Sequence, residues 1–526
     1  MKKYLKEGRQ EFFLSNFLAF INVLCVSYYP YLLSYIVDHF ASLNQTTLLF
    51  IFSTLILSVV LIVATQYLNK IVKARYQKKI CTAIRRDVFE SVAHLDYTPF
   101  HAQSMETYTS FLMNDVERLY ALYFENRIYL YNSILMLVAY TVVLAVVSWQ
   151  MCLAIIGSLM LILFIPQLVG KRFHSLNSAA SSGKADYLSR CEEILSAHDL
   201  IDGSNRPRLC GLHDKQLEHM QESDFVLEKY RSFVQCFSGS ALYFQMIFCF
   251  VVGLILSYNG LISVGIFASS LLYVEYVAQY SSNIVDEFLE IRGSKSYREK
   301  CTAMLSQPHG EEDADHTPFA SLQVNALCYE IGGKALLNHV DYEFTAGKKY
   351  LITGANGCGK STLLKLLAGF LVPTSGQVQI NGNPGCHRSD VGYIPQRRYV
   401  FAGSLLDNIT LFEKDISQDD RTRISDICAM LHLTHPLDYV ISRNGENLSG
   451  GEIAKICLVR ELYRGKELLL IDEPMNDIDV HAEADILGFL AKSKKTIIMV
   501  AHGLSSDEMF DEVVRVEDGK LFNTKH

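Results

Sequence analysis

The sequence predicts an all-α six-helix transmembrane domain followed by an α/β domain of the P-loop class. Two observations carry this prediction. Six apolar segments lie within the first 300 residues, and each is long enough to cross the ~30 Å of a bilayer as a helix. The stretch GANGCGKST at residues 354–362 follows a strand-like apolar run and precedes an apolar-faced helix, which is the setting of a P-loop. We therefore expect a transmembrane domain over 1–306, a linker over 307–318 and a P-loop domain over 319–526.

The composition supports a membrane protein and argues against other classes. Half of the 526 residues are hydrophobic, and the mean hydropathy is +0.15, which is high for a soluble chain. The net charge is −8 and no basic face or tail stands out, so we expect no nucleic-acid partner. The 13 cysteines contain no C-x-x-C pair, so the sequence indicates neither a zinc site nor a disulfide framework.

The six predicted spans alternate in their flanking charge. Lysine and arginine gather before the first span and after the second, whereas residues 38–47, 150 and 258–261 contain none. Basic residues favour the cytoplasmic side, so both termini and the two long internal connections, 70–127 and 171–231, are expected there. The spans are 13–37, 48–68, 128–149, 151–169, 232–257 and 262–285.

Glu275 is the clearest ionisable residue within a predicted span. Counted from Leu261 it lies roughly 20 Å along the helix, in the inner half of the bilayer. A carboxylate in lipid is costly and therefore suggests a functional role. We expect Glu275, Gln245 and Tyr276 to face a water-filled substrate cavity. The alternative is a polar contact between helices with no ligand.

The P-loop pattern G-x-x-x-x-G-K-[ST] extends from Gly354 to Ser361. Its glycines let backbone N–H groups turn toward phosphate oxygens, Lys360 can reach the β- and γ-phosphates, and Ser361 is expected to ligate Mg²⁺. Cys358 occupies a variable position of the loop. The expected nucleotide contacts from this loop are Gly354, Asn356, Gly357, Cys358, Gly359, Lys360, Ser361 and Thr362.

Two further motifs follow the loop. LLLIDE at 468–473 is an apolar strand that ends in two carboxylates, of which Asp472 is expected to hold Mg²⁺ and Glu473 to polarise the attacking water. NLSGGE at 447–452 offers a hydroxyl and bare amides at a predicted helix start, which favours anions. Its expected ligand contacts are Ser449, Gly450 and Gly451.

Taken together, these motifs resemble an ABC transporter half of the exporter type over nearly the whole chain. GANGCGKST, Gln396, LSGGE, LLLIDE, Asp479 and His502 occur in the family's order, and VFESVAHLDYTPF and NGLISVGIFASSLLYVEYV resemble segments of its membrane half. The resemblance implies a dimer that encloses two ATP molecules, each between the P-loop of one subunit and the LSGG segment of the other.

The resemblance also assigns roles to single residues. Gln396 would sense the γ-phosphate and Mg²⁺, His502 would contact the γ-phosphate, and Asp479 would communicate across the dimer. The adenine-stacking position falls on either Tyr329 or the non-aromatic Ile331.

Several positions depart from the family pattern. Glu452 ends the signature where glutamine is usual, Arg443 stands where an acidic residue is usual, and the loop after Glu473 reads Met475-Asn476-Asp477-Ile478. These departures lie at the expected dimer and coupling surfaces. They favour a heterodimer with a different half-transporter over a homodimer.

We expect ATP-driven transport by alternating access, with export of an amphipathic small molecule, lipid or peptide. One alternative is an importer of a metal chelate on the same fold, and another is a regulatory membrane protein gated by ATP; Glu473 and His502 argue against the latter. The six spans exclude a soluble ATPase. The expected location is a bacterial plasma membrane, where the chain contacts lipid.

Overall fold

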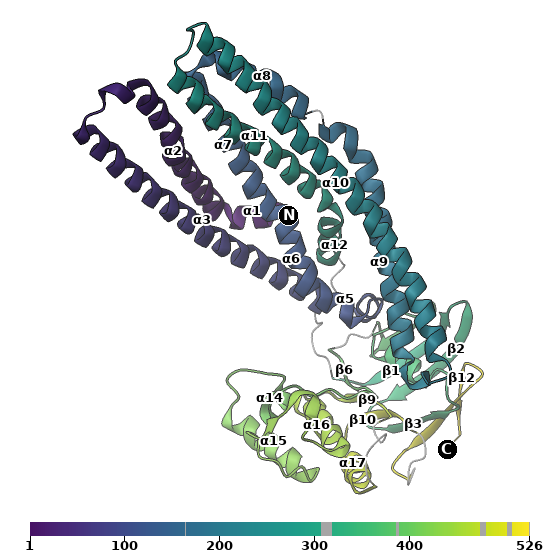
Figure 1. The fold of residues 1–526 in the computed structure, drawn as a ribbon. Helices are drawn as coiled ribbons and strands as arrows, with labels where there is room; N and C mark the ends of the chain where they lie inside the picture. Colours follow the sequence, from purple (N-terminus) through teal and green to yellow (C-terminus); the bar gives the residue numbers. More distant parts are fainter. Residues whose placement is uncertain (164, 307–317, 386–388, 474–479, 502–507, 525–526) are drawn as a thin grey trace. The chain divides into compact units, whose positions relative to one another are not determined.

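The computed structural model describes residues 1–163, 165–306, 318–385, 389–473, 480–501 and 508–524 (Figure 1). The chain divides into two compact units. We call Met1–Ala93 with Ser104–Gln307 the helical unit, and His94–Gln103 with Pro308–His526 the α/β unit. The short segment of residues 94–103 thus belongs to the α/β unit although the chain on both sides of it is part of the helical unit.

The helical unit consists of long helices joined by short turns (Figure 1). The helices are α1 (Lys2–Glu7), α2 (Arg9–His39), α3 (Gln45–Ala93), α5 (Met105–Ser110), α6 (Val116–Leu119), α7 (Asn126–Val147), α8 (Trp149–Leu163), α9 (Ile165–Ser196), α10 (Arg206–Tyr258), α11 (Val264–Gly293) and α12 (Lys295–Leu305). Short 3-10 turns occur at Phe40–Ser42 and His198–Leu200, and π-helical turns at Phe111–Asp115 and Tyr120–Glu125.

Within the described residues, helices occupy the six predicted spans, namely α2, α3, α7, α8 with the start of α9, α10 and α11. Within the described residues, Arg9–Ser42, Gln45–Ala93 and Met105–Val147 are long and apolar enough to cross a membrane. Shorter apolar helices cover Trp149–Ser158 and Tyr243–Tyr258. The helical transmembrane region is therefore confirmed, while the count of six crossings stays a prediction.

Two boundaries differ from the sequence prediction. The turn after the third span falls at Ser148, not Gln150, because Ser148 leaves the helical region with φ −156° and ψ 105°. Its hydroxyl accepts a hydrogen bond from the Met151 N–H at 3.4 Å, as an N-terminal cap does. The fifth span, predicted to begin at residue 232, is part of one longer helix, α10, which begins at Arg206.

Asp38 ties the end of α2 to the start of α11. Its Oδ2 accepts from the Ser263 hydroxyl at 2.6 Å, and its Oδ1 accepts from the Gly265 N–H at 2.8 Å. A Cβ at Gly265 would lie 2.3 Å from the Ser34 carbonyl oxygen, so only glycine permits this approach. Ser263 also caps α11 by accepting from the Ile266 N–H at 3.0 Å.

The α/β unit contains two main sheets. Its strands are β1 (Ser321–Ile331), β2 (Lys334–Thr345), β3 (Lys349–Gly354), β4 (Ser375–Ile380), β5 (Asn383–Pro384), β6 (Val391–Ile394), β7 (Gly403–Ser404), β8 (Val440–Ile441), β9 (Leu468–Asp472), β10 (Thr496–Val500), β11 (Glu512–Glu517) and β12 (Lys520–Asn523). Its helices are α4 (Tyr97–His101), α13 (Lys360–Leu367), α14 (Leu405–Thr410), α15 (Gln418–Met430), α16 (Gly450–Tyr463) and α17 (Val480–Lys492), with a 3-10 turn at Arg443–Gly445.

The larger sheet has the strand order β12-β11-β3-β10-β9-β6 and is parallel except for β12. Every residue of β9 and β10 is buried, because apolar side chains of helices cover both faces of the sheet. The smaller antiparallel sheet has the order β2-β1-β4-β5. The carboxyl ends of β3, β9 and β6 therefore lie at one edge, where this class of fold binds ligands.

Candidate functional site

The P-loop connects β3 to α13, as the sequence predicts. Gly354, Gly357 and Gly359 have φ of 148°, 79° and 102°, in a region that L side chains rarely adopt. A Cβ at Gly354 would also lie 2.6 Å from the Val516 carbonyl oxygen and 2.8 Å from the Cys358 sulfur. The glycine spacing is thus required by the geometry of the loop.

Lys360 is the first residue of α13 and is only 6% exposed. Its ammonium donates to the carbonyl oxygens of Gly354 and Ala355, at 3.0 and 2.9 Å. The positive charge is therefore held within the loop, at the N-terminus of a helix, where the backbone also favours an anion. This arrangement fits the polyphosphate of a nucleotide.

Ser361 and Asp472 meet at the end of the sheet. The Ser361 hydroxyl donates to Asp472 Oδ1 at 3.0 Å, and Asp472 is 2% exposed. Burial raises the pKa of Asp472 above its ordinary value, and the hydrogen bond from Ser361 opposes that shift. A hydroxyl and a carboxylate side by side are hard oxygen ligands of the kind Mg²⁺ takes. The residues present therefore fit the expected metal.

Glu473 and Gln396 are brought together from two neighbouring strands, β9 and β6. The Gln396 Nε2 donates to Glu473 Oε2 at 2.6 Å. Glu473 has φ of 45°, an unusual value for a residue other than glycine, and its N–H donates to the Val500 carbonyl at 2.8 Å. Such local strain often occurs at functional sites.

The LSGGE segment begins α16, as predicted. Ser449 caps the helix by accepting from the Glu452 N–H at 3.2 Å, and Glu452 Oε2 accepts from the Ser449 N–H at 2.8 Å. Burial favours the neutral acid, but hydrogen bonds from Ser449 and His435 outweigh it and hold the pKa of Glu452 below its ordinary value. The Glu452 carboxylate thus accepts a hydrogen bond from the Ser449 N–H at the start of α16, the end of the helix that is expected to bind an anion.

The two adenine-stacking candidates lie in different environments on β1. Tyr329 is half-buried and packs against a buried apolar cluster of the α/β unit, whereas Ile331 is 57% exposed. His502 and Asp479 lie outside the described residues, as does the loop from Met475 to Ile478. Their roles stay predictions.

The three predicted cavity residues also differ in environment. Glu275 is exposed, whereas Gln245 is 1% exposed and neither of its amide atoms has a hydrogen-bond partner among the described residues. Tyr276 is half-buried and stacks on Tyr140, with ring centroids 4.8 Å apart and an interplanar angle of 24°. The cavity role of these residues stays a prediction.

A series of aromatic residues without a predicted role lies near Asp472. Tyr97 of α4 stacks on Phe370, and Phe370 meets Tyr393 edge to face at 4.7 Å. Burial and the nearby charge of Asp472 raise the pKa of the Tyr393 phenol. The Lys365 ammonium lies 5.5 Å from the centroid of the Tyr97 ring. In the sequence, this series is indicated only by Tyr97 and Phe100 in the stretch VAHLDYTPF, which resembles a segment of the membrane half of ABC transporters.

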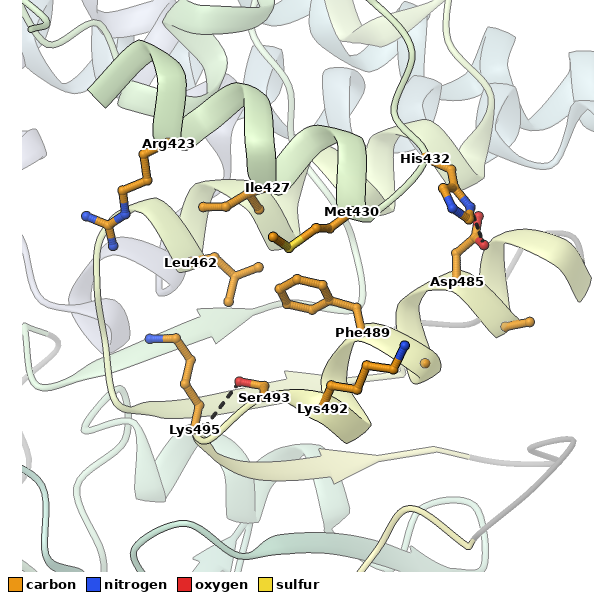
Figure 2. Close-up of a pocket in the computed structure, with 12 residues that line it drawn as sticks. Arg423, Ile427, Met430, His432, Leu462, Asp485, Phe489, Lys492, Ser493 and Lys495 are labelled. Atoms are coloured by element: carbon orange, nitrogen blue, oxygen red, sulfur yellow. Dashed lines mark hydrogen bonds and ion pairs between the residues drawn. The ribbon is translucent and has the colours of Figure 1, made fainter. Parts of the chain in front are cut away.

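A pocket of about 610 Å³ lies between α15, α16 and α17, and its lining contains no residue of the nucleotide motifs (Figure 2). Apolar side chains including Ile427, Leu462 and Phe489 line it, with Arg423 and Lys495 at one end. The nucleotide site is therefore identified by its chemistry and not by cavity size.

Comparison with known proteins agrees with both halves of this description. The sequence profile of the ABC transporter transmembrane region matches residues 12–280, which is just over half of the chain, and the ABC transporter profile matches residues 337–476. A solved bacterial Atm1-family ABC exporter with ATP bound has the same fold, with a TM-score of 0.81 at 18% identity over 99% of this chain and 95% of that one.

Relatives similar in sequence are also of this type. An export ATP-binding/permease protein of Rickettsia bellii is 23% identical over 92% of this chain and 87% of its own length. The glutathione/L-cysteine transport system protein CydC of Bacillus subtilis is 27% identical over 69% and 68%. The mesentericin transport/processing protein of Leuconostoc mesenteroides is 32% identical over 39% of this chain, but the match spans only 30% of that protein.

Proteins of this family couple ATP hydrolysis to transport, and their half-transporters act as dimers. The chain carries both parts that this activity needs, an apolar helical membrane region and an ATP-binding domain with its P-loop and paired carboxylates. It belongs to the ABC transporter family.

Proposed function

We propose that this chain is one half of an ATP-driven exporter that works by alternating access. The observation that carries the proposal is the arrangement at one sheet edge. Ser361 lies 3.0 Å from Asp472, and the next residue, Glu473, lies 2.6 Å from Gln396. Ser361 and Asp472, which fit Mg²⁺, are thus followed directly along the chain by the Glu473 carboxylate, which accepts a hydrogen bond from the Gln396 side-chain amide.

The described residues support a division of work within this site. The P-loop amides and Lys360 bind the phosphates, and Ser361 with Asp472 hold Mg²⁺, which when bound offsets the phosphate charge. Glu473 accepts a proton from the attacking water, and Gln396 orients its carboxylate. His502 would hold the water and Glu473 in place, and Asp479 would communicate across the dimer.

The second ATP-binding surface, on α16, requires another subunit. Ser449, Gly450 and Gly451 form the start of α16, and in the proposed dimer they face the phosphates bound by the partner. Glu452 and Arg443 both depart from the family pattern at this surface. These departures favour a heterodimer over a homodimer.

The transported compound is proposed to be an amphipathic small molecule, lipid or peptide. Glu275, Gln245 and Tyr276 would line its path, and relatives are named for bacteriocin peptides and for glutathione and L-cysteine. The Glu275→Gln variant tests this assignment, because an unchanged substrate-stimulated ATPase would remove Glu275 from the path. Its matched control is Gln279→Glu, a charge change one turn further along the exposed face of α11.

We further propose a bacterial plasma membrane with both termini in the cytoplasm, from the distribution of lysine and arginine around the spans. The direction of transport is tested by comparing ATP-dependent uptake into inside-out vesicles with uptake into right-side-out vesicles. Uptake into inside-out vesicles is expected for an exporter. Uptake only in the opposite orientation would identify an importer on the same fold.

The proposal is tested first by the Mg²⁺-dependent ATPase activity of the purified chain in lipid nanodiscs. Glu473→Gln is expected to keep ATP binding and to lower turnover by about 10²-fold or more, as loss of a general base does. Glu330→Gln, an exposed carboxylate on β1, is the control and should leave turnover unchanged. ATP hydrolysis retained in Glu473→Gln would contradict the assigned role, and activity that appears only after a second half-transporter is added would establish a heterodimer.

A further inference from the structure

A small polar cavity of about 190 Å³ lies inside the helical unit, among α2, α3, α7 and α11. It does not include the three residues that the sequence analysis placed in a substrate cavity. Its lining combines one carboxylate, one ammonium and several side-chain amides and hydroxyls, among them Asn22, Lys73, Asn132, Ser133 and Glu287. It is smaller than the ~300–1,000 Å³ of pockets that hold drug-sized ligands.

Two hydrogen-bond acceptors of this cavity lack donors. Glu287 Oε1 accepts from the Ser133 hydroxyl at 2.9 Å, but the buried Oε2 has no hydrogen-bond partner among the described residues. Asn132 is 8% exposed, and its buried Oδ1 is likewise without a partner there. Buried acceptors are nearly always satisfied in folded proteins, by the chain, by water or by a ligand. Two of them in one cavity indicate an occupant that brings several N–H or O–H donors.

Lys73, the cation in the lining of this cavity, interacts with an aromatic ring of the same lining. The Lys73 ammonium lies 3.9 Å from the centroid of the Tyr129 ring, where a cation–π interaction holds it. Lys73 therefore contributes a positive charge to the lining while Glu287 Oε2 remains without a hydrogen bond. The lining thus contains two acceptors without donors, on Glu287 and Asn132, and one positive group, Lys73.

We propose that this cavity binds a small zwitterion of amino-acid size, with its ammonium on Glu287 and Asn132 and its carboxylate toward Lys73. A primary ammonium has three donors, enough for both unpaired acceptors. Water can satisfy these acceptors, but it carries no charge to pair with Glu287 or Lys73. The proposal names a substrate class for the transport proposed above and therefore rests on that function.

The experiment is equilibrium binding to the full-length chain in detergent, followed by thermal unfolding. The probe is an equimolar mixture of the twenty standard L-amino acids, and the responding amino acid is then titrated alone. We expect the mixture to raise the unfolding temperature of the unmodified chain. No rise in the unmodified chain overturns the proposal.

Two variants locate the binding. Glu287→Gln keeps the shape of the side chain but removes its charge, and should weaken binding by about tenfold or more, because a hydrogen bond to a charged group is lost. Ser133→Ala, which removes the hydroxyl that donates to Glu287 Oε1, should change binding by less. Glu290→Gln on the same helix is the control, since Glu290 pairs with Arg231 at 3.7 Å outside the cavity. Binding unchanged in Glu287→Gln would overturn the proposal.

Two analogues test the zwitterion. The amine formed by removing the carboxylate from the responding amino acid should bind more weakly than the amino acid, and so should the acid that lacks the amino group. An amine that binds equally well would show that Lys73 takes no part and would overturn the zwitterion. ATPase activity that disappears in Glu473→Gln, measured with and without an added second half-transporter, separates the two proposals. Hydrolysis without amino-acid binding refutes only this inference, and binding without hydrolysis under either condition refutes only the proposed function.

Discussion

Tyr97 lies stacked on Phe370, with ring centroids 5.2 Å apart and an interplanar angle of 21°. Tyr97 belongs to α4, the short helix that the chain forms between α3 and α5, and Phe370 follows the helix that begins at the P-loop. Phe370 in turn contacts Tyr393, whose phenol lies near Asp472 and has its pKa raised by burial and by the charge of that carboxylate. Contacts between aromatic rings therefore link the connection between two long helices to the carboxylate expected to hold Mg²⁺.

Tyr97→Ala should uncouple transport from hydrolysis. Removing the stacked ring forfeits about 0.5–1.5 kcal/mol of contact with Phe370, but leaves the nucleotide motifs intact. We expect unchanged ATP binding and a several-fold loss of substrate-stimulated ATPase. Thr98→Ala, an exposed change on the same helix, is the control. Equal stimulation in Tyr97→Ala and Thr98→Ala would show that the stack carries no coupling.

Tyr393→Phe should shift the pH dependence of hydrolysis. Burial already raises the pKa of Asp472, and the Tyr393 phenol, whose own pKa is raised by burial and by the charge of Asp472, lies close enough to offer that carboxylate a proton donor. Without that donor the pKa of Asp472 rises further, so the metal-binding carboxylate is lost at a higher pH. The acid limb of the ATPase profile should move to higher pH, and half-saturation should need about tenfold more Mg²⁺. An unmoved acid limb would remove Tyr393 from this role.

Glu452→Gln should tighten the binding of ATP. Hydrogen bonds keep the pKa of Glu452 low, so its negative charge persists at neutral pH near the start of α16. In the proposed dimer that charge repels the phosphates bound by the partner, and removing it should lower the KM for ATP by roughly two- to fivefold, in line with typical helix-terminus effects. The effect should fade at high salt. A KM that does not change at low salt would argue against phosphate binding at this end of α16.

Gly354→Ala should be more damaging than Gly357→Ala. Both glycines have positive φ, so alanine is strained at either position. The added Cβ at Gly354 would also lie 2.6 Å from the Val516 carbonyl oxygen, whereas the Cβ at Gly357 meets nothing within 4 Å. We expect a loss of about 1–3 kcal/mol at Gly357 from strain and a larger loss at Gly354, measured by thermal unfolding. Equal losses of stability in the two variants would show that backbone strain alone accounts for the destabilisation.

Gln245→Met should separate structural from functional use of this side chain. Its amide is 1% exposed and unpaired within the described part of the chain, so a residue of similar volume without the amide should leave the unfolding temperature unchanged or higher. If Gln245 lines the transport path, substrate-stimulated ATPase should fall while basal ATPase stays. Stimulation that is fully retained would make the amide a packing feature of the helix bundle.

The sequence predicted the strands and helices that carry the nucleotide motifs, because the pattern of these motifs is local. A phosphate loop needs glycine at fixed spacing, a lysine and a hydroxyl within a few residues, so the pattern 354–362 alone implied β3, the loop and α13. LLLIDE predicted β9 for a similar reason, since a fully buried parallel strand is continuously apolar. The elements of the α/β unit and the helical character of the membrane region followed from such short-range rules.

Contacts between distant segments were decided only by the tertiary structure. Gln396 and Glu473 are 77 residues apart, Ser133 and Glu287 are 154 apart, and Tyr97 and Phe370 come from segments that nothing in the local pattern connects. Such pairs depend on which helix faces meet and how strands are ordered, and many apolar patterns allow several solutions. The sequence by itself determined what each segment can bind or span, whereas the packing of the helices and the order of the strands decided which polar groups meet and which remain unpaired.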